Sequence, residues 1–469
     1  MDTFTIVLLN NYFMRKKILY ASLVFASISI FNFSCQKESM ETTANETGVA
    51  SKKNNNEHGH LKQTKTFSSD VAVSWLNIQL TMFKTPRPAG TGSQATDRAQ
   101  AYSGIALYEA VMPGMPGYQT LTGQLTDFPT MPSTEPGKAY HWAASANAAL
   151  AEISRLLFNT TAQVNKDAMN NLENTLQTSY ADEADAATIE RSIAFGKEVA
   201  KRVFAWSVTD GFANINPPYI PPVGVGLWVP TAPPPAAAIN AYAFQRRLIV
   251  PGSAQGTALE PLPSFSTDPG SAFYAMVKEL YDASLLLTHE QKAMADYFKD
   301  APGYGAGGGY VWVLMEALRI AQPSLDQAAI IYAKTGMAQH DVTIVLFTSK
   351  YKFNTMRPVT YINAYIDPAW NPYLGTPNHP EFPAGHATTN GAVLTIMSNS
   401  FGEDFPMTLR MYDYLGYPSR PYSTFKQMGL DMADSRFYGG IHYKETCTKS
   451  IAQGKKVAMN ILSMVKFKK

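Results

Sequence analysis

Three short segments of the chain carry basic and imidazole side chains suited to binding an oxyanion and reacting with it. These segments contain Lys350 with Arg357, Gly385 with His386, and Arg436 with His442. Lysine and arginine neutralise oxyanions and donate hydrogen bonds to them. A histidine near neutral pH can act as nucleophile, acid, base or metal ligand. If the fold brings the segments together, they predict one anion-binding site with reactive imidazoles.

The first segment, SKYKFNTMRP, contains Lys350 and Arg357 with six residues between them, and then Pro358. Proline is disfavoured inside a helix, so we expect Pro358 to end or bend the helix before it. That bend would turn Arg357 toward the cavity that Lys350 faces. Taken alone the pair indicates little, because a lysine and an arginine at this spacing usually cover the solvent face of a helix.

The second segment, HPEFPAGH, ends at His386 and is followed by ATTNGAVLTIM, which predicts a helix beginning directly after Gly385. A helix N-terminus offers unpaired N–H groups and the positive end of the helix dipole, and a glycine lets an anion approach the main chain. His386 would lie at the rim of such a site. Without its neighbours, a capping or core histidine is the commoner interpretation.

The third segment, DSRFYGGIHYKET, contains Arg436 and His442 with five residues between them. A planar guanidinium suits a tetrahedral or trigonal oxyanion. Gly439 and Gly440 predict a turn that brings His442 back toward Arg436. Each segment is a weak signal by itself, but their order along the chain, each beside a predicted helix end, favours a common site.

The patterns K-x6-RP, P-x-GH and SR-x5-H, in that order, resemble the motifs of the vanadium haloperoxidase and type 2 phosphatidic acid phosphatase superfamily. The motifs span residues 350–442. A looser likeness to bacterial haloperoxidases covers most of 67–469 and includes DRAQAYSGIALYEAV from Asp97 and GLWVPTAPPP from Gly226. The resemblance implies a helical bundle with a pocket for vanadate or phosphate.

The resemblance also implies roles for the basic residues. Lys350, Arg357 and Arg436 would neutralise the oxygens of the bound oxyanion, and the Gly385 backbone N–H would add a further donor. Together these groups would form a cationic wall.

Three histidines complete the site that the resemblance implies. His442 matches the residue that ligates vanadium in haloperoxidases and attacks phosphorus in phosphatases. His386 matches the acid–base partner that protonates peroxide or a leaving group. His379 stands where bromoperoxidases have histidine and chloroperoxidases have phenylalanine, which favours bromide or iodide over chloride.

Two positions depart from the family pattern. Ala384 replaces a serine that donates to the oxyanion, and a lost hydrogen bond to a charged group costs about 1.5–3 kcal/mol. Phosphatases place an aspartate four residues after the nucleophilic histidine to orient its ring, whereas this chain has Thr446. The second departure argues against an efficient phosphatase unless Glu445 substitutes for the aspartate.

Apolar residues recur at three- and four-residue spacing after Thr66, and strand-like alternation is scarce, so we expect a mainly α fold. The resemblance assigns 237–469 to a haloperoxidase-like catalytic bundle, with an additional N-terminal helical region and a Pro-rich arm at 67–236. Prolines between Asn214 and Ala236 forbid helix there and predict a long ordered loop. The expected helices are 69–84, 94–113, 138–157, 184–207, 271–284, 289–299, 310–321, 324–350, 386–401, 422–437 and 447–466.

The N-terminus has the features of a secretory leader, with three basic residues at 15–17 before an apolar run at 18–31. This run is short for a membrane span. We expect 1–35 to be a signal peptide and Cys35 to be lipidated, as in bacterial lipoproteins. Asn32 occupies a position where such sites usually have leucine, so ordinary cleavage and an uncleaved anchor stay open as alternatives.

The leader predicts an exported protein that reaches the membrane only through its N-terminal lipid. Residues 36–66 are polar and predict a disordered linker between the lipid and the folded part. The balance of 39 basic and 37 acidic residues, with no long run of one sign outside the leader, speaks against a nucleic-acid partner. Gly303 to Gly308 fits G-x-G-x-x-G, but no predicted strand precedes it, so we expect a flexible glycine-rich loop. Cys447 is expected to be a buried small hydrophobe.

Three functions are compatible with these observations. The leading one is a vanadate-dependent peroxidase that uses hydrogen peroxide to oxidise a halide. The second is a soluble acid phosphatase of the same superfamily that hydrolyses a phosphate ester with His442 as nucleophile and no metal. The third is a surface lipoprotein that binds an oxyanion or a partner without turnover.

Overall fold

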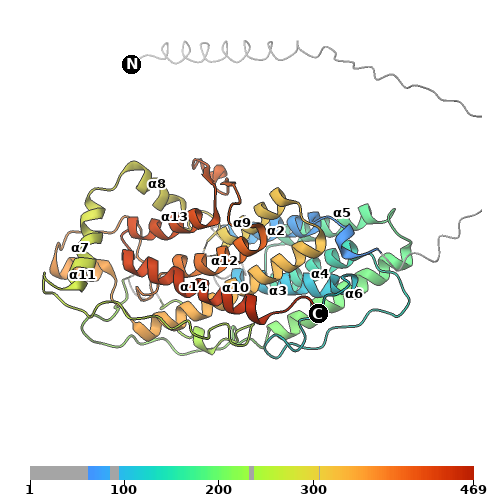
Figure 1. The fold of residues 1–469 in the computed structure, drawn as a ribbon, viewed down its shortest axis with the longest axis horizontal. Coiled ribbons are helices and arrows are strands. Elements are labelled where there is room, and N and C mark those ends of the chain that lie inside the picture. Colours follow the sequence, from blue (N-terminus) through green and yellow to red (C-terminus); the bar gives the residue numbers. More distant parts are fainter. Residues whose placement is uncertain (1–61, 85–94, 232–236, 306) are drawn as a thin grey trace, which may run out of the picture. The chain divides into compact units, whose positions relative to one another are not determined.

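The computed structural model describes residues 62–84, 95–231, 237–305 and 307–469, which lie within one compact unit, Asn55–Lys469 (Figure 1). The predicted leader at 1–35, with Cys35, lies outside the described residues, as does most of the predicted linker. The end of that linker belongs to the fold. Thr64–Thr66 form the short helix η2, and the buried Thr64 hydroxyl donates to the Val111 carbonyl at 2.7 Å.

The described residues are mainly helical, which confirms the predicted fold class. The helices are α2 (Asp70–Phe83), α3 (Ala95–Val111), α4 (Trp142–Leu157), α5 (Gln163–Tyr180), α6 (Ala186–Ser207), α7 (Ala272–Leu285), α8 (His289–Tyr297), α9 (Gly308–Ala321), α10 (Leu325–Phe353), α11 (Pro358–Tyr365), α12 (Gly385–Phe401), α13 (Phe425–Tyr438) and α14 (Lys444–Met464). Two short strands, β1 (Met407–Leu409) and β2 (Arg420–Tyr422), pair antiparallel, with Met407 opposite Tyr422.

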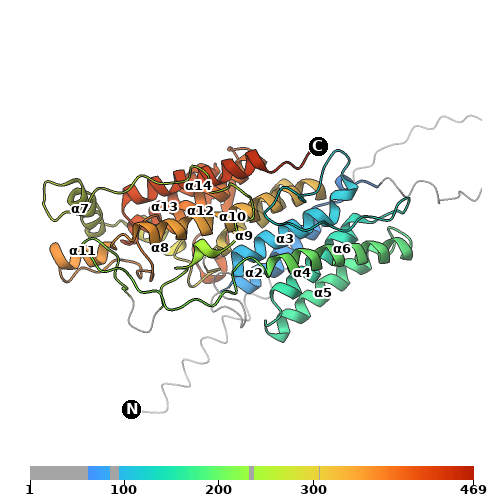
Figure 2. The same ribbon diagram turned by 90° about the horizontal axis from the view of Figure 1, so that it is seen from below.

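The helices on which the three motifs lie gather in one bundle. Figures 1 and 2 both show α12, α13 and α14 side by side, with α7 and α11 at the end of this bundle that is remote from α4, α5 and α6. The long helix α10 packs along α3 and α12, so it joins the N-terminal helices to the bundle. A continuous apolar core, which includes residues as far apart as Phe67 and Phe467, spans both regions.

Two pairs of helices approach each other closely because each helix has a glycine at the crossing. A Cβ at Gly104 of α3 would lie 2.7 Å from the Tyr332 carbonyl oxygen, and one at Gly336 of α10 would lie 2.5 Å from the Gln100 carbonyl oxygen. In the α12 and α14 pair, Cβ atoms at Gly391 and Gly454 would overlap main-chain oxygens of the opposite helix. These contacts fix the spacing of the helices that carry the motifs.

The Pro-rich segment has no regular helix or strand in its described part, as its composition predicts. It runs against the loop of the first motif. Leu227 bridges to Thr355, and the Trp228 N–H donates to the Asn354 carbonyl at 2.7 Å. Farther along, the Ile239 N–H donates to the Asn378 carbonyl at 3.0 Å. The segment therefore supports the loops before Arg357 and before His379.

Membrane spans were sought in the same described ranges. None of the helices there is both long enough and apolar enough to cross a bilayer.

Candidate active site

A cavity of about 310 Å³ lies where α9, α10, α12 and α13 meet. Its polar lining includes residues of the second and third motifs together with residues from elsewhere in the chain: Asp97, Asp300, Thr343, His379, Gly385, His386, Arg436 and His442. Apolar side chains such as Leu346, Phe347 and Ile441 complete the wall. Among the described residues that line the cavity, Lys350 and Arg357 do not occur. Both side chains lie behind the wall that these residues form.

The first motif is built differently from the sequence-based expectation. Helix α10 continues to Phe353 and ends at Asn354, which adopts a left-handed conformation with φ 50°. Pro358 therefore neither ends nor bends that helix. It is the first residue of α11, where its fixed φ is favourable and its missing N–H costs nothing. Arg357 precedes α11 as its N-cap residue and is fully buried.

Lys350 holds the loop of the second motif through its main chain. Its ammonium group donates to the carbonyl oxygens of Pro380 at 2.8 Å and Glu381 at 3.0 Å. The Glu381 N–H in turn donates to the Thr355 carbonyl at 2.9 Å. The first motif thus fixes the segment that leads into α12.

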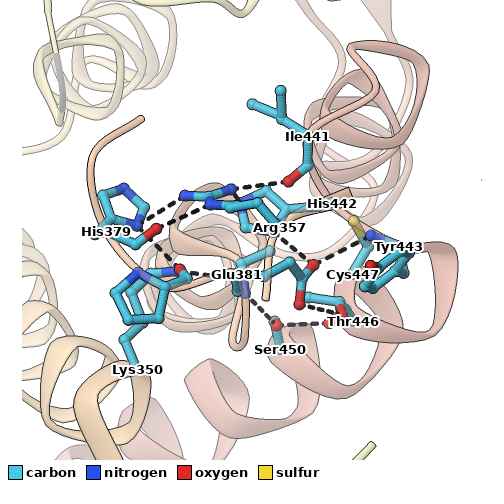
Figure 3. Close-up of polar contacts among 12 residues, drawn as sticks. Lys350, Arg357, His379, Glu381, Ile441, His442, Tyr443, Thr446, Cys447 and Ser450 are labelled. Atoms are coloured by element: carbon cyan, nitrogen blue, oxygen red, sulfur yellow. Dashed lines mark hydrogen bonds and ion pairs between the residues drawn. The ribbon is translucent and has the colours of Figure 1, made fainter. Parts of the chain in front are cut away.

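Arg357 lies between the two histidines that line the cavity (Figure 3). Its Nη2 is 2.9 Å from His379 Nδ1, and its Nη1 is 3.4 Å from His442 Nε2. It also donates from Nε to the His379 carbonyl and from Nη1 to the Ile441 carbonyl, each at 2.8 Å. One guanidinium therefore ties the second motif to the third.

Helix α12 begins at Gly385, as predicted, and its first turn faces the cavity. A Cβ built at Gly385 would meet nothing within 4 Å, so open space lies in front of the main chain there. The first N–H groups of a helix have no carbonyl partner inside the helix. The preceding N–H, of Ala384, is used: it donates to the Ser450 hydroxyl of α14 at 2.8 Å.

His386 lies in the first turn of α12 and lines the cavity. Its Nε2 is 3.2 Å from Oδ1 of Asp300, which lies in the loop between α8 and α9. No motif points to Asp300, and the contact joins residues 86 positions apart. A carboxylate at this distance can hold the orientation of the ring.

The third motif places Arg436 in the last turn of α13 and His442 just before α14. Arg436 donates from Nη1 to the Phe298 carbonyl at 2.7 Å and lines the cavity. Gly440 has φ 75°, a left-handed conformation that favours glycine, so the expected turn between the two residues is present.

His442 is oriented by Glu381, a residue that the sequence analysis did not assign to the site. Nδ1 of His442 is 2.9 Å from Glu381 Oε1. The suggestion that Glu445 takes this part is wrong, because Glu445 pairs with Lys449 at 2.8 Å on the surface of α14. The sequence did offer one indication of this role, because Glu381 is the carboxylate within the second motif, HPEFPAGH.

Burial dominates the electrostatics of the site. It raises the pKa of Glu381 to about 7, although Arg357 and Lys350 act in the opposite direction. Burial, helped by Arg357, holds the pKa values of Lys350 and His442 well below their usual ranges. It also lowers the pKa of Arg357 to about 10. Burial thus disfavours the charged forms of Lys350 and Arg357, and a bound anion would favour them again.

The whole-chain comparisons agree with the motifs. Residues 330–468 match the family model described as the VCPO second helical-bundle domain. The fold is similar to that of a bacterial vanadium-dependent iodoperoxidase, with 25% identity, a TM-score of 0.75, and coverage of 86% of this chain and 97% of that one. The chain has the fold of the vanadium haloperoxidase superfamily. The resemblance seen in the sequence is confirmed.

A second similar structure is a bacterial vanadium-dependent chloroperoxidase in its holo form. It shares 16% identity with a TM-score of 0.62, and the match covers 82% of this chain and 94% of that one. The apo form of a bacterial vanadium-dependent chloroperoxidase gives 16% identity and a TM-score of 0.57, covering 78% and 92%. The curated protein sequences contain no match to this chain.

The residues of this cavity fit an oxyanion such as vanadate. Arg436, the main chain at Gly385 and the ring of His442 line one cavity, with open space in front of Gly385. Arg357 can only donate hydrogen bonds, so its approach to His442 Nε2 requires an unprotonated nitrogen there. An unprotonated imidazole nitrogen is the form that ligates a metal or attacks phosphorus.

Proposed function

We propose that the protein is a vanadate-dependent haloperoxidase that oxidises iodide or bromide with hydrogen peroxide. The observation that carries the proposal is the pair of contacts that the His442 ring makes inside the cavity lined by Arg436 and Gly385. Nδ1 of the ring faces the Glu381 carboxylate, and Nε2 faces the cationic side of the site at Arg357. The overall similarity to an iodoperoxidase at 25% identity supports this choice within the superfamily.

When bound, vanadate would supply a Lewis-acidic centre that activates hydrogen peroxide toward attack by the halide. In the overall reaction the halide loses two electrons and takes up oxygen as hypohalous acid, while peroxide is reduced to water. Arg436 and the Gly385 N–H would hold the oxyanion from the cavity, and Lys350 and Arg357 would add positive charge from behind the wall. His442 Nε2 would be the protein ligand.

His386 would supply the proton that the reaction consumes. It lines the same cavity as His442, and Asp300 holds its ring from the other side. A positioned imidazole at the cavity wall is the kind of group that acts as a general acid. His379 also lines the cavity, where we propose that it faces the halide.

A phosphatase is the second candidate, and one contact favours it more than the sequence did. Thr446 occupies the position of the aspartate that orients the phosphatase nucleophile, which argued against hydrolysis. Glu381 places a carboxylate on the same ring from another segment. His442 is therefore oriented as a nucleophile would need to be.

One assay series separates the candidates. The purified protein is incubated with orthovanadate, and oxidation of iodide and bromide by hydrogen peroxide is measured. In parallel, hydrolysis of a generic phosphomonoester is measured without vanadate. A haloperoxidase gives vanadate-dependent halide oxidation that His442→Ala abolishes, whereas a phosphatase gives hydrolysis that vanadate inhibits. If the folded protein shows neither halide oxidation nor hydrolysis, both enzyme candidates are contradicted. A non-catalytic binding protein would then remain.

We also propose that the protein is exported and anchored through a lipid on Cys35. The support is the sequence of the leader, with its basic residues at 15–17 and apolar run at 18–31. In a bacterial host, Cys35→Ser should release the protein from the membrane fraction. An unchanged distribution would contradict the lipid anchor.

A further inference from the structure

We propose that Glu381 is the positioning residue of His442, and that it fixes both the tautomer and the orientation of the reacting imidazole. The inference rests on the proposed function of His442 as that imidazole. The residue does for this chain what an aspartate four residues after the histidine does in the phosphatases, but from a loop before α12 instead of from α14.

The contacts of the His442 ring define a single tautomer. Glu381 Oε1 lies 2.9 Å from Nδ1 and also accepts a hydrogen bond from the Tyr443 N–H at 3.2 Å. Arg357 Nη1, 3.4 Å from Nε2, can only donate. Nδ1 therefore carries the proton, and Nε2 keeps the lone pair that could bond the vanadium or phosphorus atom of a bound oxyanion in place of the Arg357 hydrogen bond.

The carboxylate itself is held on both oxygens (Figure 3). While Oε1 faces His442 and Tyr443, Oε2 accepts from the Thr446 hydroxyl at 3.0 Å. Thr446 is thus not simply a missing aspartate. It orients Glu381, the acid that contacts His442 in this chain.

The main chain around Glu381 is also fixed. Lys350 binds its carbonyl, and Thr355 accepts its N–H at 2.9 Å. On α14, Ser450 donates to the Thr446 carbonyl at 2.6 Å and accepts the Ala384 N–H at 2.8 Å. The loop from Glu381 to Ala384 is therefore attached to α10 at one end and to α14 at the other.

Burial makes the contact with His442 effective. Glu381 is 0% exposed and the His442 side chain is 4% exposed, so water does not compete for the hydrogen bond. A hydrogen bond from an imidazole to a buried carboxylate increases the basicity of the opposite ring nitrogen and prevents the ring from turning. Replacing a residue that holds a ligating histidine in this way typically lowers metal affinity or activity by about 10–100-fold.

The test compares Glu381→Gln with Glu445→Gln. Glu445 is the carboxylate that the sequence analysis offered as the partner of His442, so its variant is the control. In the vanadate-free protein labelled with ¹⁵N-histidine, the ring N–H of His442 is identified by its absence in His442→Gln. We expect Nδ1–H in the wild type and in Glu445→Gln, and an upfield shift of that proton in Glu381→Gln, because a neutral acceptor binds it more weakly. Orthovanadate affinity should fall about 10–100-fold in Glu381→Gln and stay unchanged in Glu445→Gln.

Two further variants keep the test decisive. Glu381→Asp keeps the charge and should retain more vanadate affinity than Glu381→Gln. Thr446→Val removes only the donor to Oε2, should fold whether or not Glu381→Gln does, and should weaken vanadate binding by a smaller factor. The proposal is overturned if the Nδ1–H signal and the vanadate affinity of the folded Glu381 variants and Thr446→Val match the wild type. A wild type that binds no vanadate would refute the proposed function, while the ring signal would still report on Glu381.

Discussion

At the scale of single residues, the two histidines proposed to react differ in their surroundings. His442 is almost fully buried and is held by Glu381, whereas the His386 side chain is 20% exposed and is held by Asp300 at 3.2 Å. A buried neutral ring suits a ligand or nucleophile, and a ring with access to water suits an acid that must be reprotonated in each cycle. The site thus separates the two tasks by burial.

The different surroundings of the two histidines predict what happens when His386 or its partner Asp300 is replaced. His386→Ala should lower kcat for halide oxidation by about 10²–10⁴-fold, the usual contribution of a general acid, and should change orthovanadate affinity much less. Asp300→Asn should lower kcat by a smaller factor. Steady-state kinetics and vanadate titration of the same preparations give both values, and a loss of vanadate binding equal to the loss of kcat would contradict the assignment.

Ala384 gives a prediction in the opposite direction. It is the N-cap residue of α12 and its side chain makes no cap hydrogen bond. In Ala384→Ser the hydroxyl can cap the helix, which is typically worth about 1 kcal/mol, and can donate to the anion. Orthovanadate should bind about tenfold more tightly, and the thermal midpoint should rise. Weaker binding by the serine variant would show that the hydroxyl does not reach the anion.

The residues brought together by the motifs were predictable because each motif is a local pattern. Arg357 contacts both His379 and His442, Lys350 binds the main chain of the second motif, and Arg436 and His442 line the same cavity. Glu381 and Asp300 were not predicted, because the resemblance assigns a role to neither, and the histidines they contact lie 61 and 86 positions away. Pairings over such distances depend on tertiary packing, which no local spacing encodes.

At the scale of elements, apolar spacing predicted most of the described helices. It missed α5 and α11. Helix α5 (QVNKDAMNNLENTLQTSY) is polar and buries only Met169, Glu173 and Tyr180, and α11 has eight residues that follow a proline. Both helices depend on packing against neighbours more than on their own pattern.

The close crossing of α12 and α14 predicts a strong effect of one methyl group. In Gly454→Ala the new Cβ would overlap the Thr388 carbonyl oxygen and lie 2.8 Å from the Ala392 nitrogen. Overpacking of this kind typically costs about 1–3 kcal/mol, and here it would also push the start of α12 away from His442. Chemical denaturation should show the loss of stability, together with weaker vanadate binding.

Gly309 of α9 is the matched control. A Cβ there would meet only Met411 Sδ at 3.6 Å, an ordinary contact. Alanine is favoured over glycine within a helix by up to about 1 kcal/mol, so Gly309→Ala should be neutral or stabilising. Equal destabilisation by the two substitutions would contradict the role given to the crossing.

At the scale of the whole molecule, one core joins the N-terminal helices to the bundle with the site, so the stability of the fold and the integrity of the site are linked. Glu109 of α3 is a buried carboxyl group among the N-terminal helices. Its carboxylate accepts from the Leu121 N–H at 2.6 Å and from the Thr120 hydroxyl. Burial raises its pKa from 4.5 to about 7.

This shift predicts how stability changes with pH. Between pH 4.5 and 7 the unfolded chain has released the Glu109 proton while the folded chain retains it, so its contribution to stability falls as the pH rises through this window. The full effect is about 3 kcal/mol. Relative to the wild type, Glu109→Gln should gain that amount between pH 4.5 and 7. Urea denaturation at several pH values measures it, and a constant difference would contradict the prediction.

We propose that Gly385, Arg436 and His442 enclose one oxyanion, with Lys350 and Arg357 adding positive charge from behind the cavity wall. Calorimetric titration of the purified protein with orthovanadate tests it most directly, with Arg436→Ala and His442→Ala as variants whose folding is checked by circular dichroism. We expect one binding site per chain in the wild type and a large loss of affinity in both variants. Absence of binding in the wild type, or the same affinity in the folded variants, would contradict it.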